Sequence, residues 1–396
     1  MKYILVVPDG VADKPIAELG NQTPLEKAKT PHLDAIVQKG LLGQIQTVPH
    51  ALPSGSDVAC MSLLGYDPKR YYTGRAPLEA ASLGIPMQEG EVAFRCNLVT
   101  VQDGKMQDYS AGHISSDEAK QLIETLQQKL GNDEFRFYPG VQYRHILITR
   151  GYKDVQCTPP HDIAGKEIKF YEPKEGNGAE KLRVLMENSA HTLGEQEVNV
   201  KRKEEGKLPA TQIWLWGQGT RPTLPTFKDQ YGLDGAVISA VDLVRGVGRL
   251  VDLEVIQVPG ATGYFDTDYA AKAQYGLEAL QRKDFLFIHV ESTDEAGHMG
   301  DAEKKVDAIQ DFDQKLLGTL LEGLAKLDSF RLLLLPDHMT STAIRTHTHD
   351  PVPFVVYGNG VEKNGFLRFT ESEAENSLLM VSDGYTIMGK FLKGEL

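Results

Sequence analysis

Aspartate and histidine side chains follow three apolar runs of the chain that are predicted strands. The runs are residues 3–7, 285–290 and 331–335, and the side chains that follow are Asp9, Asp294, His298, Asp337, His338 and His347. In an open parallel sheet, ligand sites gather outside the carboxyl ends of the strands, so these side chains are expected to meet at one edge. Mixed carboxylate and imidazole ligands suit Mn²⁺ or Zn²⁺ better than Ca²⁺. The set is large enough for two ions, which is typical of phosphoryl-transfer enzymes.

An Asp–His pair taken singly is also compatible with a surface loop or a helix cap. Asp294 and His298 are four residues apart, a spacing that lets both side chains share one helix face and one ion. Five of the 11 histidines lie between residues 289 and 349. This clustering, together with three acidic strand ends, favours a metal site over separate loops and caps.

Ser56 begins a predicted helix over residues 56–65, directly after Pro53, Ser54 and Gly55. The commonest role of such a serine is to cap the helix N-terminus. The same position favours a nucleophilic alkoxide beside a metal ion, and it stabilises a phosphate on that oxygen. The local sequence leaves both interpretations open.

Four basic residues are candidates for binding an anion: Arg75, Arg95, Arg144 and Lys272. A guanidinium can grip a phosphate or carboxylate with two hydrogen bonds, although a single arginine is more often part of a surface ion pair. The chain has neither the glycine-rich phosphate loop that ends in Gly-Lys-Ser/Thr nor the dinucleotide fingerprint. A nucleotide cofactor is therefore not expected.

The amino-acid composition argues against several classes of partner and protein. The net charge of −13 argues against nucleic-acid or anionic-membrane partners, which are met by clustered Lys and Arg, but it permits a small anionic substrate. The three scattered cysteines predict neither a disulfide framework nor a cysteine zinc site. No apolar run approaches the ~20 residues that span a membrane. These features predict a cytoplasmic protein.

The elements around these residues predict an α/β protein with an insertion. A buried strand over residues 3–7 is followed by a helix that opens at Thr30-Pro31, and buried strands return at residues 212–216, 253–258, 285–290 and 331–335. We expect residues 1–84 and 206–396 to form one domain, with a mostly parallel sheet flanked by helices.

The intervening residues 85–205 predict an α+β domain of their own. Ser115 and Glu118 form a capping box ahead of a helical stripe of leucines. Further expected elements are strands at residues 92–100, 135–138 and 145–149, a helix at 179–193, and a polar linker at 195–207.

Motifs spread over nearly the whole chain resemble the archaeal-type, cofactor-independent phosphoglycerate mutases of the alkaline phosphatase-like metalloenzyme superfamily. In order, the motifs occupy residues 8–10, 55–59, 64–68, 72–75, 111–114, 143–145, 159–162, 260–264, 294–298, 337–338 and 347–353. The resemblance implies an alkaline phosphatase-like metal-binding domain that carries an inserted phosphotransfer domain.

The resemblance also implies roles for the residues. Ser56 matches the phosphorylated nucleophile. One ion beside that serine would be held by Asp9, Asp337 and His338, and the other by Asp294, His298 and His347, while His349 has no clear counterpart. In the inserted domain, His113, Arg144 and Asp162 would handle the substrate, with Arg75, Arg95 and Lys272 as further substrate-binding candidates.

The activity that the resemblance implies is the interconversion of 3-phosphoglycerate and 2-phosphoglycerate through phosphoserine. It would need two divalent ions, but neither 2,3-bisphosphoglycerate nor a nucleotide. Three alternatives stay open at this point. They are a related phosphotransferase acting on another hydroxyl acceptor such as homoserine, a metal-dependent phosphatase, and a non-catalytic metal-binding protein.

Overall fold

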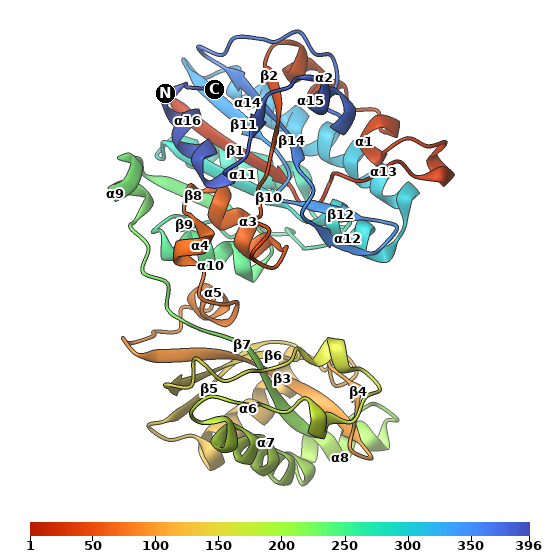
Figure 1. Ribbon diagram of the computed structural model, residues 1–396, viewed down its shortest axis with the longest axis vertical. Coiled ribbons are helices and arrows are strands. Elements are labelled where there is room, and N and C mark those ends of the chain that lie inside the picture. Colours follow the sequence, from red (N-terminus) through yellow and green to blue (C-terminus); the bar gives the residue numbers. More distant parts are fainter. The chain divides into compact units, whose positions relative to one another are not determined.

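An eight-stranded sheet organises one of two units in the computed structural model, which describes residues 1–396 (Figure 1). This unit consists of Met1–Tyr72 and Leu224–Leu396. The strand order is β15-β2-β14-β11-β1-β10-β8-β9, and β14 alone runs opposite to the others. The strands are β1 (Lys2–Pro8), β2 (Leu41–Ile45), β8 (Gly235–Ile238), β9 (Glu254–Val255), β10 (Phe285–Val290), β11 (Phe330–Leu334), β14 (Val352–Gly358) and β15 (Met380–Val381).

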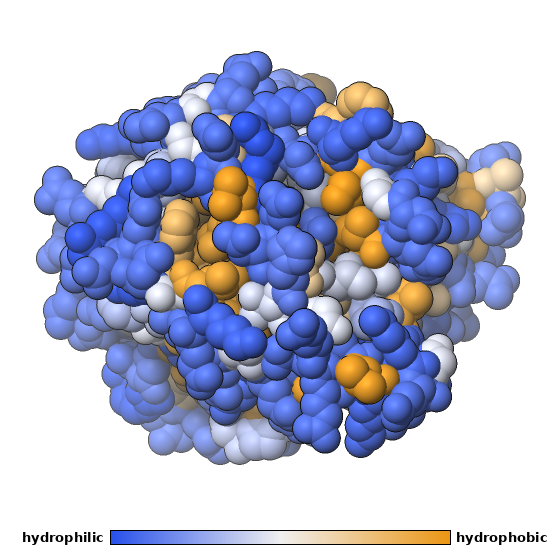
Figure 2. Space-filling model, turned by 90° about the horizontal axis from the view of Figure 1, so that it is seen from below, coloured by the Kyte–Doolittle hydropathy of each residue, from blue (hydrophilic) through white to orange (hydrophobic).

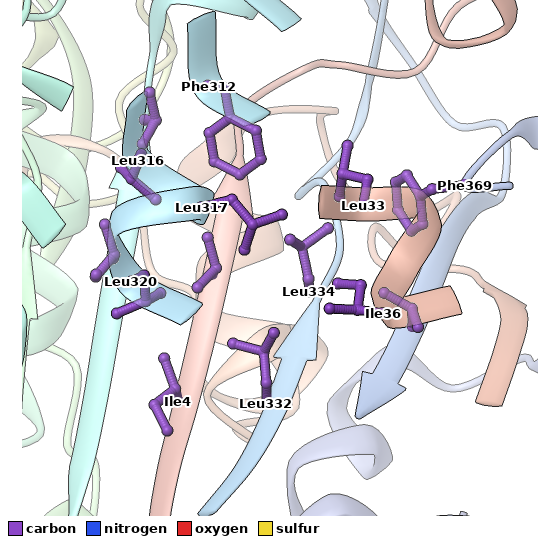
Figure 3. Packing of buried hydrophobic residues seen from close by; sticks show 14 of the residues in the cluster. Ile4, Leu33, Ile36, Phe312, Leu316, Leu317, Leu320, Leu332, Leu334 and Phe369 are labelled. Atoms are coloured by element: carbon purple, nitrogen blue, oxygen red, sulfur yellow. The ribbon is translucent and has the colours of Figure 1, made fainter. Parts of the chain in front are cut away.

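The central strands β1, β10 and β11 are apolar because helices cover both faces of a parallel sheet. Ile4, Leu332 and Leu334 pack against Phe312 and Leu317 of a helical segment (Figure 3). That segment contains a π-helical turn, η4 (Phe312–Leu317), between α13 and α14. The helices of this unit are α1 (Pro24–Lys27), α2 (Pro31–Gln38), α3 (Ser56–Leu63), α4 (Pro68–Tyr71), α9 (Phe227–Tyr231), α10 (Asp242–Leu250), α11 (Tyr269–Leu280), α12 (Ser292–Met299), α13 (Ala302–Asp311), α14 (Gly318–Leu324), α15 (Glu371–Asn376) and α16 (Ile387–Lys393).

The second unit, Thr73–Thr223, contains an antiparallel five-stranded sheet and has a hydrophobic core of its own. Its strands follow the order β4-β3-β6-β5, and β7 pairs with β3. They are β3 (Glu91–Gln102), β4 (Lys105–Asp108), β5 (Phe135–Val141), β6 (Arg144–Arg150) and β7 (Gln212–Thr220). The helices are α5 (Ala76–Ser82), α6 (Ser116–Leu130), α7 (Ala179–Gly194) and α8 (Glu197–Glu204). The capping box of Ser115 and Glu118 is confirmed at α6.

The predicted fold class is confirmed, with three corrections to its elements. The strand expected at 212–216 belongs to β7, which pairs with β3 of the second unit rather than with the large sheet. The stretch predicted as a linker contains α8, because Asn199 and Arg202 are buried and Arg202 pairs with Glu118 at 2.9 Å. The strand expected at 253–258 is reduced to β9.

Two further features concern the surface. The face drawn in Figure 2 is mostly hydrophilic, with hydrophobic residues in small separate groups. None of the helices combines the length and the apolar character that a bilayer crossing requires.

Candidate metal centre

The ends of the central strands bring the predicted side chains to one edge of the sheet. β1 lies between β10 and β11 and is parallel to both, so their carboxyl ends lie side by side. Asp9 directly follows β1, and Asp337 and His338 follow β11. Asp294 and His298 lie on α12, which begins after β10, and His347 lies on β13 (Thr346–Thr348).

Three of these residues, Asp9, Asp337 and His338, form what we call the serine-side group. The Nε2 atom of His338 lies 3.5 Å from Oδ1 of Asp9 and 3.4 Å from Oδ2 of Asp337. The same Nε2 atom lies 3.1 Å from the Ser56 hydroxyl. All three side chains are buried. The group therefore offers one imidazole and two carboxylates beside a serine oxygen.

The serine-side group fits a divalent cation. Oδ1 of Asp9 and Oδ2 of Asp337 are buried and have no hydrogen-bond partner, an arrangement that is costly for carboxylates. Burial and the neighbouring charge of Asp337 raise the pKa of Asp9 well above its usual value. A cation would remove this repulsion, because it supplies the charge that the orphaned oxygens lack.

The other three residues, Asp294, His298 and His347, form what we call the histidine-pair group. His298 Nε2 lies 3.2 Å from Asp294 and His347 Nε2 lies 3.4 Å from it, and the two Nε2 atoms are 2.9 Å apart. Each Nδ1 atom faces a backbone carbonyl, that of Arg345 at 3.0 Å and that of Ser54 at 3.1 Å. Each Nδ1 therefore carries a proton, and both Nε2 lone pairs point at the same space.

A proton or a metal ion must lie between these two Nε2 atoms. The preference for positive charge is also electrostatic, because the hydrogen bond that His298 donates to the Asp294 carboxylate raises the pKa of His298 to about 9. One carboxylate and two imidazoles are a ligand set that Mn²⁺ or Zn²⁺ accepts. The histidine-pair group therefore fits a second divalent ion.

Ser56 is placed differently from the capping role that the sequence left open. α3 begins at Ser56 itself, its N-cap residue is Gly55, and no side chain caps it. The Ser56 oxygen faces His338 instead of its own helix backbone. The positive end of the helix dipole lies at this oxygen, which favours negative charge there.

A buried chain of charged residues that was not predicted from the sequence adjoins the serine-side group. His289 Nε2 lies 3.5 Å from Oδ2 of Asp9, and His289 Nδ1 lies 3.4 Å from Glu291. Glu291 pairs with Lys272 at 2.6 Å. Although burial opposes the charged form, the carboxylates around His289 raise its pKa well above the usual value. The available signal was a histidine inside the apolar run 285–290 with a glutamate directly after it.

This chain of contacts corrects the expectation for Lys272. The side chain is fully buried, and its ammonium group donates to Glu291 and to the His289 carbonyl at 3.2 Å. Such a position does not support direct contact with a substrate. His349 also faces away from both groups, since its Nε2 donates to the carbonyl of Leu52 at 2.9 Å.

In the second unit, considered by itself, the three predicted arginines gather around an aromatic cluster. The Arg95 guanidinium lies 4.2 Å above the Trp216 ring and pairs with Glu79 at 3.0 Å. Burial, together with the positive charges of Arg75 and Arg144, lowers the pKa of Arg95. A concentration of positive charge at this place suits an anionic ligand.

The other predicted residues of the second unit are exposed. His113 has a φ of 50°, and its backbone N–H donates to Ser110. Asp162 lies 3.7 Å from His161, whose ring packs on Trp216 with the centroids 5.2 Å apart. The contact between His161 and Trp216 was not predicted, because the two residues are far apart in the sequence and no local pattern indicates that they meet.

The chain is similar to proteins of one known family. Residues 37–199 match the family model described as 2,3-bisphosphoglycerate-independent phosphoglycerate mutase. A probable 2,3-bisphosphoglycerate-independent phosphoglycerate mutase of Geobacter sulfurreducens is 48% identical over 99% of this chain and 100% of its own. The 2,3-bisphosphoglycerate-independent phosphoglycerate mutase of Methanosarcina acetivorans is also 48% identical, with the same coverage.

Two solved structures extend the comparison to the fold. A protein from Pyrococcus horikoshii aligns with a TM-score of 0.85 and 30% identity, over 99% of this chain and 96% of its own. The cofactor-independent phosphoglycerate mutase of Thermoplasma acidophilum aligns with a TM-score of 0.68 and 29% identity, over 99% of both chains.

Proposed function

Because the chain belongs to the family of 2,3-bisphosphoglycerate-independent phosphoglycerate mutases, we propose that it interconverts 3-phosphoglycerate and 2-phosphoglycerate through a phosphoserine at Ser56. The motifs of the sequence indicate the same family. The observation that carries the proposal is the position of the Ser56 oxygen. It lies at the N-terminus of α3, 3.1 Å from His338 and beside two orphaned carboxylate oxygens.

We assign two divalent ions, Mn²⁺ or Zn²⁺, to the serine-side group and the histidine-pair group. Ser56, Asp9, Asp337 and His338 would hold the first ion, and Asp294, His298 and His347 would hold the second. When bound, such ions neutralise the charge of the transferring phosphoryl group and favour the alkoxide form of serine. The proposal requires no 2,3-bisphosphoglycerate and no nucleotide.

In the first half of the reaction, the Ser56 oxygen attacks the phosphorus of 3-phosphoglycerate. The bond between Oγ and phosphorus forms, the bond from phosphorus to the 3-oxygen breaks, and the 3-oxygen takes up a proton. The products are phosphoserine and glycerate. The positive end of α3 stabilises the negative charge of the phosphate on Ser56.

In the second half, the bond from the 2-oxygen of glycerate to phosphorus forms and the bond from phosphorus to Oγ of Ser56 breaks. The 2-hydroxyl gives up its proton, and Oγ of Ser56 takes up a proton again. We assign the second unit to substrate binding, with Arg144 on the glycerate carboxylate and Arg75 and Arg95 as further anion ligands. Asp162 or His113 would move the proton of the hydroxyl.

The substrate of this reaction is a small phosphorylated metabolite. The three cysteines, Cys60, Cys96 and Cys157, are free in the structure. Free thiols suit a reducing compartment, and we propose that the reaction takes place in the cytoplasm.

A coupled assay tests the proposal. Mn²⁺-loaded protein is supplied with 3-phosphoglycerate and no 2,3-bisphosphoglycerate, and enolase reports the 2-phosphoglycerate that forms. We expect turnover that a chelator abolishes and that added Mn²⁺ restores. Absence of turnover in folded, Mn²⁺-bound protein would contradict the mutase activity.

A further inference from the structure

Thr340 lies between the two ligand groups and contacts both. It is the middle residue of β12 (Met339–Ser341), and it pairs with His347 of the neighbouring strand β13. Its side chain is fully buried. The hydroxyl donates a short hydrogen bond to Oδ1 of Asp294, and it lies 3.2 Å from Nδ1 of His338.

The directions of these two hydrogen bonds follow from the number of protons. A hydroxyl has one proton to donate, and here the Asp294 carboxylate accepts it. Toward His338 the same oxygen can therefore only accept, so Nδ1 of His338 carries the proton. The Nε2 lone pair of His338 is then directed at Asp9, Asp337 and Ser56. One hydroxyl thus orients an imidazole of the serine-side group and a carboxylate of the histidine-pair group.

Two glycines enclose the Thr340 side chain and fix its orientation. A Cβ atom on Gly10, whose φ is +57°, would lie 2.2 Å from the Thr340 hydroxyl oxygen. A Cβ atom on Gly297 would lie 2.7 Å from the Thr340 methyl carbon. Lys305 holds the backbone, because its ammonium donates to the Thr340 carbonyl at 2.6 Å. The hydroxyl is thus kept between Asp294 and His338.

We propose that Thr340 is a positioning residue shared by both ion sites, which fixes the His338 tautomer and the Asp294 carboxylate through one hydroxyl. This inference rests on the assignment of divalent ions to the two groups. It does not depend on the identity of the substrate. Partners that orient a metal ligand in this way typically change metal affinity by about 10- to 100-fold when they are removed.

The test uses Thr340→Val, which keeps the shape of the side chain and removes the hydroxyl. Titration calorimetry with Mn²⁺ measures each site separately, in a His298→Ala background for the serine-side group and in an Asp9→Asn background for the histidine-pair group. We expect Mn²⁺ affinity to fall about tenfold or more in both backgrounds. Thr340→Ser retains a hydroxyl and should keep the affinities within about threefold of the parent values.

Thr342→Val is the matched control. Thr342 is buried two residues further along and also loses a hydrogen bond to a carboxylate, that of Asp13, which belongs to neither group. We expect this variant to bind Mn²⁺ like its parent. An equal loss in Thr342→Val and Thr340→Val, a loss at only one site, or no rescue by Thr340→Ser would overturn the inference.

The outcomes separate this inference from the proposed function. If the chain binds two Mn²⁺ ions and responds to Thr340→Val as expected, yet forms no 2-phosphoglycerate, the result would support the role of Thr340 and overturn the mutase activity. If the chain is an active mutase and Thr340→Val leaves its Mn²⁺ affinities unchanged, the proposed function stands and the inference about Thr340 is overturned. A parent chain that binds neither Mn²⁺ nor Zn²⁺ would overturn both.

Discussion

Three buried residues next to the serine-side group, Lys272, Glu291 and His289, contact one another through their charged groups. Lys272 and Glu291 form a fully enclosed ion pair, and Glu291 in turn faces His289. Burial alone would raise the pKa of Glu291, but the positive charge of Lys272 keeps it well below its usual value. The lysine is therefore linked through Glu291 and His289 to Asp9 of the serine-side group.

Replacing Lys272 tests that structural role. Lys272→Met removes the ammonium partner of the buried Glu291 carboxylate, and we expect the free energy of unfolding to fall by about 3–5 kcal/mol. Chemical denaturation measures the loss. Lys228→Met, which removes an exposed pair with Asp234, should cost no more than about 1 kcal/mol. If Lys272→Met leaves the stability unchanged but raises KM, the result would contradict the structural role and favour the substrate contact predicted from the sequence.

At the scale of elements, α15 is tied to the loop that follows β1. The Glu371 carboxylate accepts from the Asp13 backbone N–H at 2.9 Å and from the Thr23 hydroxyl at 2.7 Å. Burial raises the pKa of Glu371 from 4.5 to about 7. The folded protein therefore holds a proton on Glu371 that the unfolded chain releases at lower pH.

This shift predicts a pH dependence of stability. The contribution of Glu371 is fully present below its unfolded pKa of 4.5, and it is lost as the pH rises toward 7. Glu371→Gln stays neutral, so its stability relative to the parent should increase between pH 5 and pH 8 by on the order of 2 kcal/mol. Urea unfolding at the two pH values measures the change. Glu375→Gln, exposed on the same helix, should show no such increase, and an equal increase there would refute the assignment.

How far the elements follow from the sequence depends on whether the deciding contact is local. Residues 3–7 are apolar at every position, which correctly indicated a strand covered on both faces. Residues 213–216 of β7 are also apolar, but no local feature of them tells which sheet the strand joins. The helix α8 was missed because its stability depends on Arg202 reaching Glu118, a residue 84 positions away.

The same distinction applies to the candidate site. Asp9 and Asp337 could be found because they end recognisable strands whose carboxyl ends meet at one edge. His289 and Glu291 had only a weak signal, a histidine inside an apolar run and a glutamate after that run, because the partners that satisfy a buried polar group become known only from the fold. The aromatic partners of Arg95 depend on the antiparallel pairing of β3 and β7, which becomes known only from the fold.

At the scale of the whole molecule, each unit has its own sheet and its own core. The nucleophile and both ligand groups belong to the unit formed by the two ends of the chain, while the clustered arginines belong to the inserted unit. The net charge of −13 places these few arginines in a generally acidic chain. Under the proposed function, this local positive charge would attract an anionic substrate in spite of the net negative charge.

The central claim is that the phosphoryl group passes through Ser56, and acid quenching during turnover tests it most directly. Mn²⁺-loaded protein turning over 3-phosphoglycerate is quenched, digested and examined by mass spectrometry for phosphopeptides. The account predicts a phosphoryl group on Ser56 that is absent after chelation. It also predicts that Ser56→Ala loses activity by about 10⁴-fold or more while still binding Mn²⁺. Full turnover by Ser56→Ala, or a phosphoryl group on another residue, would contradict the account.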